Sequence, residues 1–223
     1  MQPMRINKFV ALCSTSMSRR AADRAVEMGR IKINDELAAP GSLVHEGDRV
    51  TIDDRQLTPP KQLVTLIFNK PTGYVCSKRG QGSQTIYDLL PESFRALNPI
   101  GRLDKDSSGL LLLTNDGNRA QELTHPSKQK TKVYEIKLDK PLSDKDVTKI
   151  TSIGVLLGDG ESKLQLEKLG NSPLEWKVSM HEGRNRQIRR TFQALDYKVT
   201  RIHRTQFGPY KLGPLGSGKF EYL

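Results

Sequence analysis

Two carboxylates, Asp104 and Asp106, lie in a charged turn that leads directly into an apolar run. The stretch from Pro99 to Gly117 reads PIGRLDKDSSGLLLLTNDG, and its four consecutive leucines predict a buried strand. Asp104 therefore lies in a tight loop at the mouth of that strand, where a rigid backbone can hold one carboxylate against a cleft. Such a carboxylate can act as a nucleophile, as a base or as a backbone cap.

The overall composition favours a globular protein that binds a polyanion. The chain has 223 residues, of which 35% are hydrophobic, and a formal net charge of +11. Lysine and arginine gain affinity for nucleic acid by releasing condensed counterions, so nucleic acid is the expected partner. No apolar run approaches the roughly 18 residues of a membrane span, and the first residues lack the apolar core of a signal peptide. We therefore expect a cytoplasmic protein without a membrane partner.

Cysteine and histidine are too scattered to predict a metal site or a disulfide framework. Cys13 and Cys76 are far apart and outside any paired ligand spacing. The four histidines show no spacing that would place two of them on one helix face. We expect no bound metal, and we expect both cysteines to be small buried hydrophobic residues.

Residues 1–53 have the pattern of a small separate domain. Apolar residues recur at helical spacing near its start, and Ser16 or Ser18 can cap a second helix. Residues 1–34 contain seven basic and two acidic residues, whereas residues 35–60 contain two basic and six acidic residues. This asymmetry predicts one electropositive face.

A polar segment with two adjacent prolines, residues 54–62, is the predicted linker to a second domain at 63–223. The second domain opens with a predicted strand at 63–68 and a turn at 69–73. Alternating strands with few helices between them favour an α+β fold, in which a mixed, mostly antiparallel sheet is flanked by helices.

Two later segments carry polar side chains beside apolar faces. Residues 130–138 alternate as a strand that places Tyr134 on the same face as Ile136. A strand tyrosine is more often a core residue whose hydroxyl is satisfied. Residues 182–192 predict a helix capped by Asn185 with arginines crowded at one end, which by itself indicates a basic surface that faces RNA.

The motifs of the chain resemble those of a known family. GRLDKDSSGL at 101–110, followed by LTNDG at 113–117, resembles the signature of the RsuA-like pseudouridine synthases, which isomerise uridines in structured RNA. The segments that resemble further motifs of this family are NKPTG at 69–73, KVY at 132–134, EGRNRQIRR at 182–190 and RIHRTQFGP at 201–209. The N-terminal domain resembles the alpha-L RNA-binding domain of a small-subunit ribosomal protein. The resemblance spans nearly the whole chain.

This resemblance implies a reaction that breaks the glycosidic bond of a uridine, turns the base over and rejoins it through carbon 5. Asp104 would be the nucleophile or the charge that supports glycal formation, and these alternatives stay open. Tyr134 would stack on the uracil and accept the proton. Arg189 would pair with Asp104 and hold it ionised, because an opposite charge within about 4–6 Å favours the charged form. No redox step occurs, so no cofactor is expected.

Other residues receive supporting roles. By the same resemblance, Arg102 would fill the gap left when the uridine flips out of its stack, and Ile202 would supply an apolar wall beneath the uracil. Lys70 is expected to brace the catalytic loop, and Asp106 is expected to hydrogen-bond the loop backbone. The expected RNA contacts are Lys8, Arg19, Arg20, Arg24, Lys32, Arg184, Arg186 and Arg190.

The partner implied by the resemblance is ribosomal RNA or a ribosomal subunit precursor, bound by a monomer. Two other function classes stay open on the sequence alone. A non-catalytic RNA-binding or ribosome-assembly protein would leave cellular pseudouridine unchanged when Asp104 is replaced. A nucleosidase or glycosidase would need a second catalytic carboxylate about 5–9 Å away, and the sequence identifies none.

Overall fold

The buried apolar side chains of the described residues gather in three clusters. The structure, a computed structural model, describes residues 3–14, 17–125 and 130–223. One cluster belongs to a small N-terminal unit, and the other two cover opposite faces of one large sheet.

The N-terminal unit is built on two short helices, α1 (Ile6–Cys13) and α2 (Arg19–Glu27). Their apolar faces are buried against each other, as the helical spacing in the sequence predicts. Ser18 caps α2 by accepting a hydrogen bond from the backbone N–H of Ala21 at 3.2 Å. The alternative cap, Ser16, lies outside the described residues.

Short strands complete the N-terminal unit. A two-stranded pair joins β1 (Met4–Arg5) to β4 (Leu43–Val44). An antiparallel sheet in the order β3-β2-β5-β6 consists of β2 (Ile31–Ile33), β3 (Glu36–Leu37), β5 (Val50–Ile52) and β6 (Arg55–Gln56). Leu57 also contacts the N-terminal core. The ordered unit therefore continues past the predicted boundary at 53, into the first part of the predicted linker.

A large mixed sheet forms the rest of the molecule. Its main path runs in the order β13-β14-β10-β15-β9-β7-β17. These strands are β7 (Thr65–Lys70), β9 (Ser108–Thr114), β10 (Lys132–Leu138), β13 (Gln165–Lys168), β14 (Glu175–Met180), β15 (Val199–Phe207) and β17 (Phe220–Tyr222). Two short strands, β8 (Asn98–Ile100) and β16 (Tyr210–Lys211), pair with β9 and β15. Every pairing in this sheet is antiparallel except β9 with β15, which confirms the predicted fold class.

The leucine run forms the centre of the sheet. Leu110, Leu111, Leu112 and Leu113 are all fully buried. Because side chains alternate along a strand, Leu111 and Leu113 join the cluster on one face while Leu110 and Leu112 join the cluster on the other. The strand is therefore anchored from both sides, and the loop that enters it is held in place.

Helices pack against the sheet. The α-helices of this part are α3 (Gly117–Thr124), α4 (Asp144–Thr148) and α5 (Gln187–Gln193). Shorter turns are η1 (Ile86–Asp88), η2 (Glu92–Ala96) and the π-helical η4 (Lys149–Ile153), which continues α4. A hairpin joins β11 (Val155–Leu157) to β12 (Gly160–Ser162) through the Gly-Asp-Gly sequence at 158–160.

Two sequence predictions about element boundaries need correction. The first strand of the large sheet begins at Thr65 and includes Asn69 and Lys70, which the sequence assigned to a turn. Asn185 does not cap α5, because the capping position is occupied by Arg186 with φ 47° and ψ 31°. That left-handed conformation is uncommon for an arginine and marks a constrained site.

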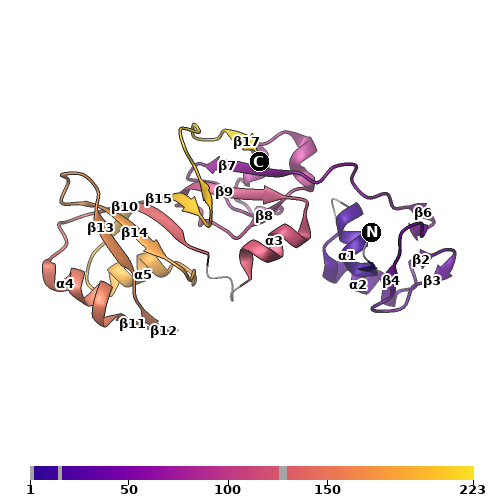
Figure 1. Cartoon of the computed structure of the whole chain (residues 1–223), viewed down its shortest axis with the longest axis horizontal. Helices are drawn as coiled ribbons and strands as arrows, with labels where there is room; N and C mark the ends of the chain where they lie inside the picture. Colours follow the sequence, from indigo (N-terminus) through magenta and orange to yellow (C-terminus); the bar gives the residue numbers. More distant parts are fainter. Residues whose placement is uncertain (1–2, 15–16, 126–129) are drawn as a thin grey trace.

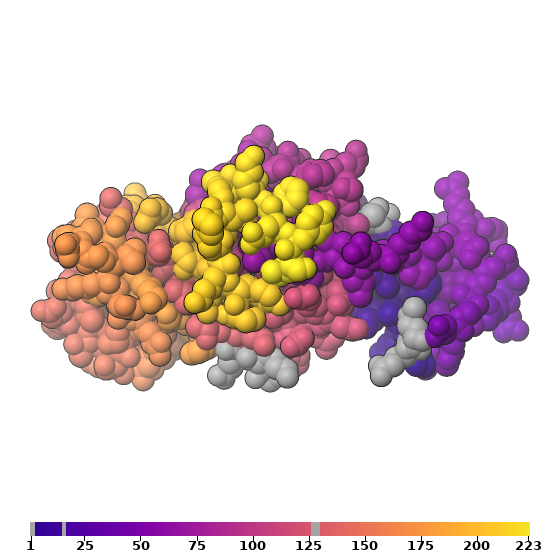
Figure 2. Space-filling model, turned by 45° about the horizontal axis from the view of Figure 1, so that its top comes forward, coloured from indigo at the N-terminus to yellow at the C-terminus, as the bar shows by residue number. Residues whose placement is uncertain are grey.

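Figure 1 shows an elongated molecule with the N-terminal unit at one end. Strands β7 and β9 lie in the middle, and β10, β14 and α5 lie at the opposite end. Figure 2 shows the C-terminal segment lying across the middle of the molecule, consistent with the pairing of β17 with β7. Every helix in the described part of the chain is too short or too polar to cross a lipid bilayer.

Candidate active site

The loop between β8 and β9 is fixed by a buried lysine. Lys70 is inaccessible to solvent, and its Nζ donates hydrogen bonds to the backbone oxygens of Asp104 at 3.0 Å, Ser107 at 2.7 Å and Pro71 at 3.0 Å. Burial lowers the pKa of Lys70. Three carbonyl oxygens converging on one ammonium group fix the path of the loop, which agrees with the bracing role predicted for Lys70.

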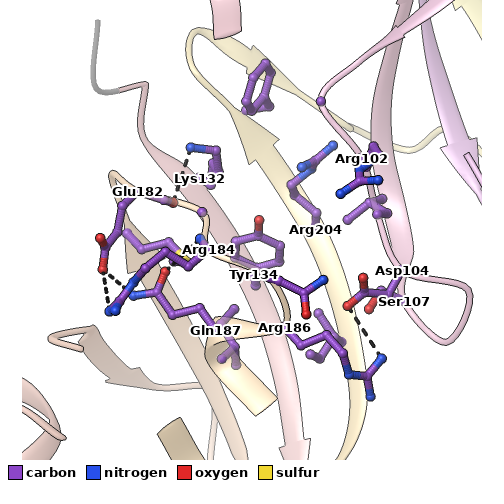
Figure 3. A pocket seen from close by; sticks show the side chains of 18 of the residues that line it. Arg102, Asp104, Ser107, Lys132, Tyr134, Glu182, Arg184, Arg186, Gln187 and Arg204 are labelled. Atoms are coloured by element: carbon purple, nitrogen blue, oxygen red, sulfur yellow. Dashed lines mark hydrogen bonds and ion pairs between the residues drawn. The ribbon is translucent and has the colours of Figure 1, made fainter. Parts of the chain in front are cut away.

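A cleft of about 790 Å³ opens where this loop meets the far half of the sheet. Its walls come from the loop 101–107, from strands β10 and β15, and from the segment 180–189 that leads into α5. Figure 3 shows side chains from all of these walls pointing into the cleft, with Tyr134 near its centre.

Asp104 presents its carboxylate to this cleft. The side chain is 36% exposed, and its Oδ2 lies 3.7 Å from Nη1 of Arg186. Figure 3 shows this ion pair at one side of the cleft. Because its other surroundings are open, Asp104 can meet a substrate while a guanidinium group holds its direction.

Asp106 is the point where two arginines meet. Arg186 donates to both of its carboxylate oxygens at 3.1 Å, and Nε of Arg189 forms an ion pair with Oδ2 at 3.1 Å. Nη2 of Arg189 also donates to the backbone oxygen of Asp106 at 3.0 Å. Burial pushes the pKa of Asp106 upward, but the hydrogen bond from Arg186 and the two positive charges outweigh burial, so the pKa is lowered.

These contacts correct two sequence predictions. Arg186, and not Arg189, is the ion-pair partner of Asp104. The carboxylate of Asp106 bonds to guanidinium groups, whereas the sequence assigned it to the loop backbone. The arginines were visible in the motif, but Arg186 and Arg189 are one helical turn apart, and their spacing could not decide which one meets Asp104.

Tyr134 and Ile202 line the same cleft from neighbouring strands. Tyr134 is 8% exposed and Ile202 is 5% exposed. The pairing of β10 with β15 shifts register between Val133 and Tyr134, so a bulge lies next to the tyrosine. Bulges commonly re-aim a side chain beside an active site. Within the described ranges nothing hydrogen-bonds the Tyr134 hydroxyl, so it is available to a ligand.

The remaining predicted pocket residue, Arg102, is exposed and lines the cleft. Its side chain points into the cleft in Figure 3. The structure therefore brings Arg102, Asp104, Tyr134, Arg189 and Ile202 around one cavity, although they come from segments almost 100 residues apart.

The predicted RNA contacts of the N-terminal unit divide into exposed and engaged residues. The exposed ones, which we call the α2 arginines, are Arg19, Arg20 and Arg24. Lys32 forms an ion pair with Asp54 at 2.8 Å. Nζ of Lys8 donates to Oδ1 of Asn118 at 2.6 Å, which joins α1 to α3 of the large domain.

Two other predicted RNA contacts are engaged within the protein. Nη1 of Arg184 donates to the backbone oxygens of Asp159 and Gly160 and to the Asp159 carboxylate, and its Nη2 donates to Glu161 and Glu182. Arg190 donates to both carboxylate oxygens of Asp159 at 2.9 and 2.8 Å. These guanidinium groups attach the β11–β12 hairpin to α5 and to the segment that leads into it.

Comparison with known proteins connects this geometry with an activity. The sequence profile of the family described as RNA pseudouridylate synthase matches residues 64–194. This chain belongs to the RNA pseudouridylate synthase family. It is 34% identical over 221 residues to the protein of Salmonella typhi named "Dual-specificity RNA pseudouridine synthase RluF", a match that covers 98% of this chain and 75% of that protein.

Other relatives of this pseudouridine synthase support the same conclusion. The protein of Xylella fastidiosa (strain Temecula1 / ATCC 700964) named "Ribosomal large subunit pseudouridine synthase B" is 35% identical over 220 residues, covering 92% of this chain and 45% of that protein. A crystal structure of a pseudouridylate synthase superposes with a TM-score of 0.70 at 30% identity, covering 99% of this chain and 96% of the other. The predicted family, fold and enzyme class are thereby confirmed, and RNA is the substrate.

Proposed function

We propose that this pseudouridine synthase isomerises a specific uridine of ribosomal RNA and that Asp104 is its catalytic carboxylate. The observation that carries the proposal is the position of Asp104, whose partly exposed carboxylate faces the cleft beside Arg186. The names of the relatives from Salmonella typhi and Xylella fastidiosa support an RNA and a ribosomal substrate, respectively. Arg186 also donates hydrogen bonds to both carboxylate oxygens of Asp106. The guanidinium group of Arg186 is therefore held in place before the substrate binds.

The other cleft residues have roles that follow from their surroundings. The buried ring of Tyr134 offers a stacking surface for the uracil, and its hydroxyl, which no described residue hydrogen-bonds, can accept the proton from carbon 5. Ile202 closes the floor beneath the base. Arg102 is exposed enough to enter the gap that the flipped uridine leaves, a step that offsets an unstacking cost of a few kcal/mol.

In this proposal the N-terminal unit, which continues to Leu57, holds a second part of the RNA, and the following residues up to 62 connect it to the catalytic domain at 63–223. The α2 arginines are solvent-exposed and carry positive charge, so they suit phosphate contacts. We propose that the protein acts as a monomer in the cytoplasm on a ribosomal subunit precursor.

The test combines mapping with one substitution. Pseudouridines are mapped in ribosomal RNA from cells with and without the protein, and the missing position gives the target. Purified Asp104→Asn is then assayed on a hairpin that spans this uridine. We expect the rate to fall by a factor of about 1,000 or more, because the carboxylate that attacks the sugar or supports the glycal is removed. Binding of the same hairpin should persist, since the substitution removes a negative charge from an RNA site.

Asp144→Asn is the matched control, because it removes a carboxylate from the exposed start of α4, far from the cleft lining. It should keep the wild-type rate. Pseudouridine formation by Asp104→Asn at the wild-type rate would refute the role of Asp104. Release of free uracil by the wild-type protein would instead indicate a hydrolase.

A further inference from the structure

One buried arginine of the cleft has no charged partner within the described residues. Arg204 lies on β15, is 2% exposed and lines the cleft. Its Nε donates to the backbone oxygen of Leu110 at 2.8 Å, and its guanidinium carbon lies 5.1 Å from the ring centre of Phe207. Nη2 is closed off from solvent and bonds to nothing in the described part of the chain.

This arrangement is costly for the protein alone. A guanidinium group keeps its charge inside a protein, and burying a charge without a counter-charge is strongly unfavourable. The hydrogen bond to Leu110 uses only one of the five N–H donors. Among the described residues no carboxylate lies within ion-pair distance of Arg204, so an anion that is not part of the protein can offset its charge.

The neighbours of Arg204 in the cleft are also cations. Nζ of Lys132 lies 5.7 Å from the centre of the same Phe207 ring, so two positive groups approach one aromatic side chain. Burial lowers the pKa of Lys132, and the charge of Arg204 lowers it further, while the charge of Glu182 opposes the shift. Arg102 lines the cleft as well, and Figure 3 shows it pointing into the same part of the cleft as Arg204. The carboxylates that line the same cavity, Asp104 and Glu182, already pair with Arg186 and Arg184, so these three cations predict a negatively charged occupant.

The strand register connects these cations to the reaction. Tyr134 and Arg204 are directly paired on β10 and β15, and opposed residues of antiparallel strands project from the same face. A nucleotide stacked on the Tyr134 ring therefore brings its backbone close to Arg204. The uracil itself is neutral and would not offset the charge, whereas a phosphate matches the planar fork of a guanidinium.

We infer that Arg204 binds a backbone phosphate next to the flipped uridine, with the nearby charges of Lys132 and Arg102 adding attraction, an inference that rests on the proposed function. The interaction fixes the register of the RNA in the cleft and contributes affinity at this one linkage. Arg204 is an RNA-binding residue in this assignment, and Asp104 keeps the chemistry.

The experiment neutralises phosphates one at a time. The mapped hairpin is synthesised with a single methylphosphonate at each linkage around the target uridine. Binding of each hairpin is measured with the Asp104→Asn protein, which does not convert the target uridine. We expect one linkage whose neutralisation weakens binding roughly tenfold, the size of one charge-assisted hydrogen bond. In Asp104→Asn/Arg204→Gln, binding of the unmodified hairpin should be weaker by the same factor, and that linkage should no longer matter.

Arg201→Gln is the matched control, since Arg201 is exposed on the same strand and pairs with Glu175 outside the cleft lining. It should preserve the sensitivity to the methylphosphonate. If Arg204→Gln does not fold, Arg204→Lys is used in its place and should reduce the sensitivity, because an ammonium group cannot reproduce the planar fork of the guanidinium. Equal binding of all methylphosphonate hairpins by the Asp104→Asn protein, or equal sensitivity with and without Arg204, would overturn the inference.

A second measurement separates this inference from the proposed function. If mapping finds no target uridine, the melting temperature of the wild-type protein is measured in inorganic phosphate and in chloride of equal ionic strength. The inference predicts a larger stabilisation by phosphate that Arg204→Gln loses and Arg201→Gln keeps. In that case, equal stabilisation of wild type and Arg204→Gln by phosphate would overturn the phosphate site.

Discussion

Asp104 and Asp106 have different surroundings, which suit the two carboxylates to different roles. Asp106 is held by two guanidinium groups, and its lowered pKa reflects that charge environment. Asp104 meets one of the same groups at 3.7 Å and otherwise opens to the cleft. The carboxylate of Asp106 therefore serves as an anchor for Arg186, and that of Asp104 remains free to react.

Substitution of the two arginines should separate catalysis from stability. Arg186→Gln should lower kcat by about 10- to 100-fold, because Asp104 loses the guanidinium group that directs it. Arg189→Gln should lower the free energy of unfolding by about 1–3 kcal/mol, since Arg189 donates to the backbone oxygens of Val199 and Asp106. Steady-state kinetics and urea unfolding of both variants test this assignment.

A larger fall of kcat in fully folded Arg189→Gln than in Arg186→Gln would contradict it. That result would restore the pairing of Arg189 with Asp104 that the sequence motif predicts. Arg186→Lys serves as the conservative variant and should recover part of the rate, because it keeps a positive charge near Asp104.

Among the elements, the parallel pairing of β9 with β15 depends on a glycine. Gly109 has φ +104°, and a Cβ at this position would lie 2.5 Å from the backbone nitrogen of Arg204 and closer still to its carbonyl oxygen. Backbone cannot move aside as a flexible side chain can, so only glycine fits here. The strand that follows the Asp104 loop and the strand that carries Arg204 are thereby held close together.

Gly109→Ala should lower the free energy of unfolding by about 2–4 kcal/mol, because steric overlap adds to the backbone strain. Gly213→Ala is the matched control: Gly213 has φ +60° and open space around its Cβ position, so strain alone should cost about 1–2 kcal/mol. Urea unfolding measures both. Equal destabilisation of the two variants would show that a Cβ at Gly109 does not overlap with the backbone of Arg204.

His203, on the same strand, predicts a pH dependence of stability. Its Nδ1 lies 2.9 Å from Oγ of Ser108, and burial lowers its pKa, with Glu135 opposing and Arg201 adding to this shift. Below the unfolded value of about 6.5 the unfolded chain binds a proton that the folded chain does not, so stability falls as the pH drops through this range.

His203→Gln removes the titrating group while keeping a polar side chain. The melting temperature of wild type should therefore fall more steeply than that of His203→Gln as the pH drops from about 7.5 to about 5.5. Parallel curves for the two proteins would show that the pKa of His203 does not change on folding.

At the scale of the whole molecule, positive charge lies at two distant places. The α2 arginines are exposed on the N-terminal unit, while the arginines of the cleft lie in the catalytic domain. The hydrogen bond from Lys8 to Asn118 joins the two parts. An RNA bound at both places gains affinity from each, because binding at the first raises the effective concentration for the second.

Replacing all three α2 arginines by glutamine should weaken binding of the target hairpin and leave kcat at saturating RNA unchanged. The slope of log Kd against log salt should fall by up to about 3, roughly one unit for each phosphate that the variant no longer neutralises. A matched triple substitution to glutamine at Lys145, Lys149 and Lys198, which are exposed elsewhere, should change the slope far less. Equal changes would refute a specific role for α2.

The sequence by itself determined the local secondary structure and the position of the Asp104 loop at the start of the leucine strand. Apolar periodicity predicted α1 and the leucine strand, because each depends on neighbours a few residues away. The motif string around Asp104 indicated the family and hence the fold. These predictions succeeded because local pattern specifies which face of an element is buried.

Only the tertiary structure decided which long-range partners meet. Arg186 adopts a left-handed backbone conformation that no propensity predicts for arginine, and this sets its ion pair with Asp104, more than 80 residues away. The register of β10 with β15 placed Arg204 opposite Tyr134, a relation that spacing along the chain does not contain. Arg184 likewise hydrogen-bonds the β11–β12 hairpin, a contact that the sequence did not predict. A sequence pattern indicates which face of a helix or strand is buried. Which other element packs against that face depends on the arrangement of the whole sheet.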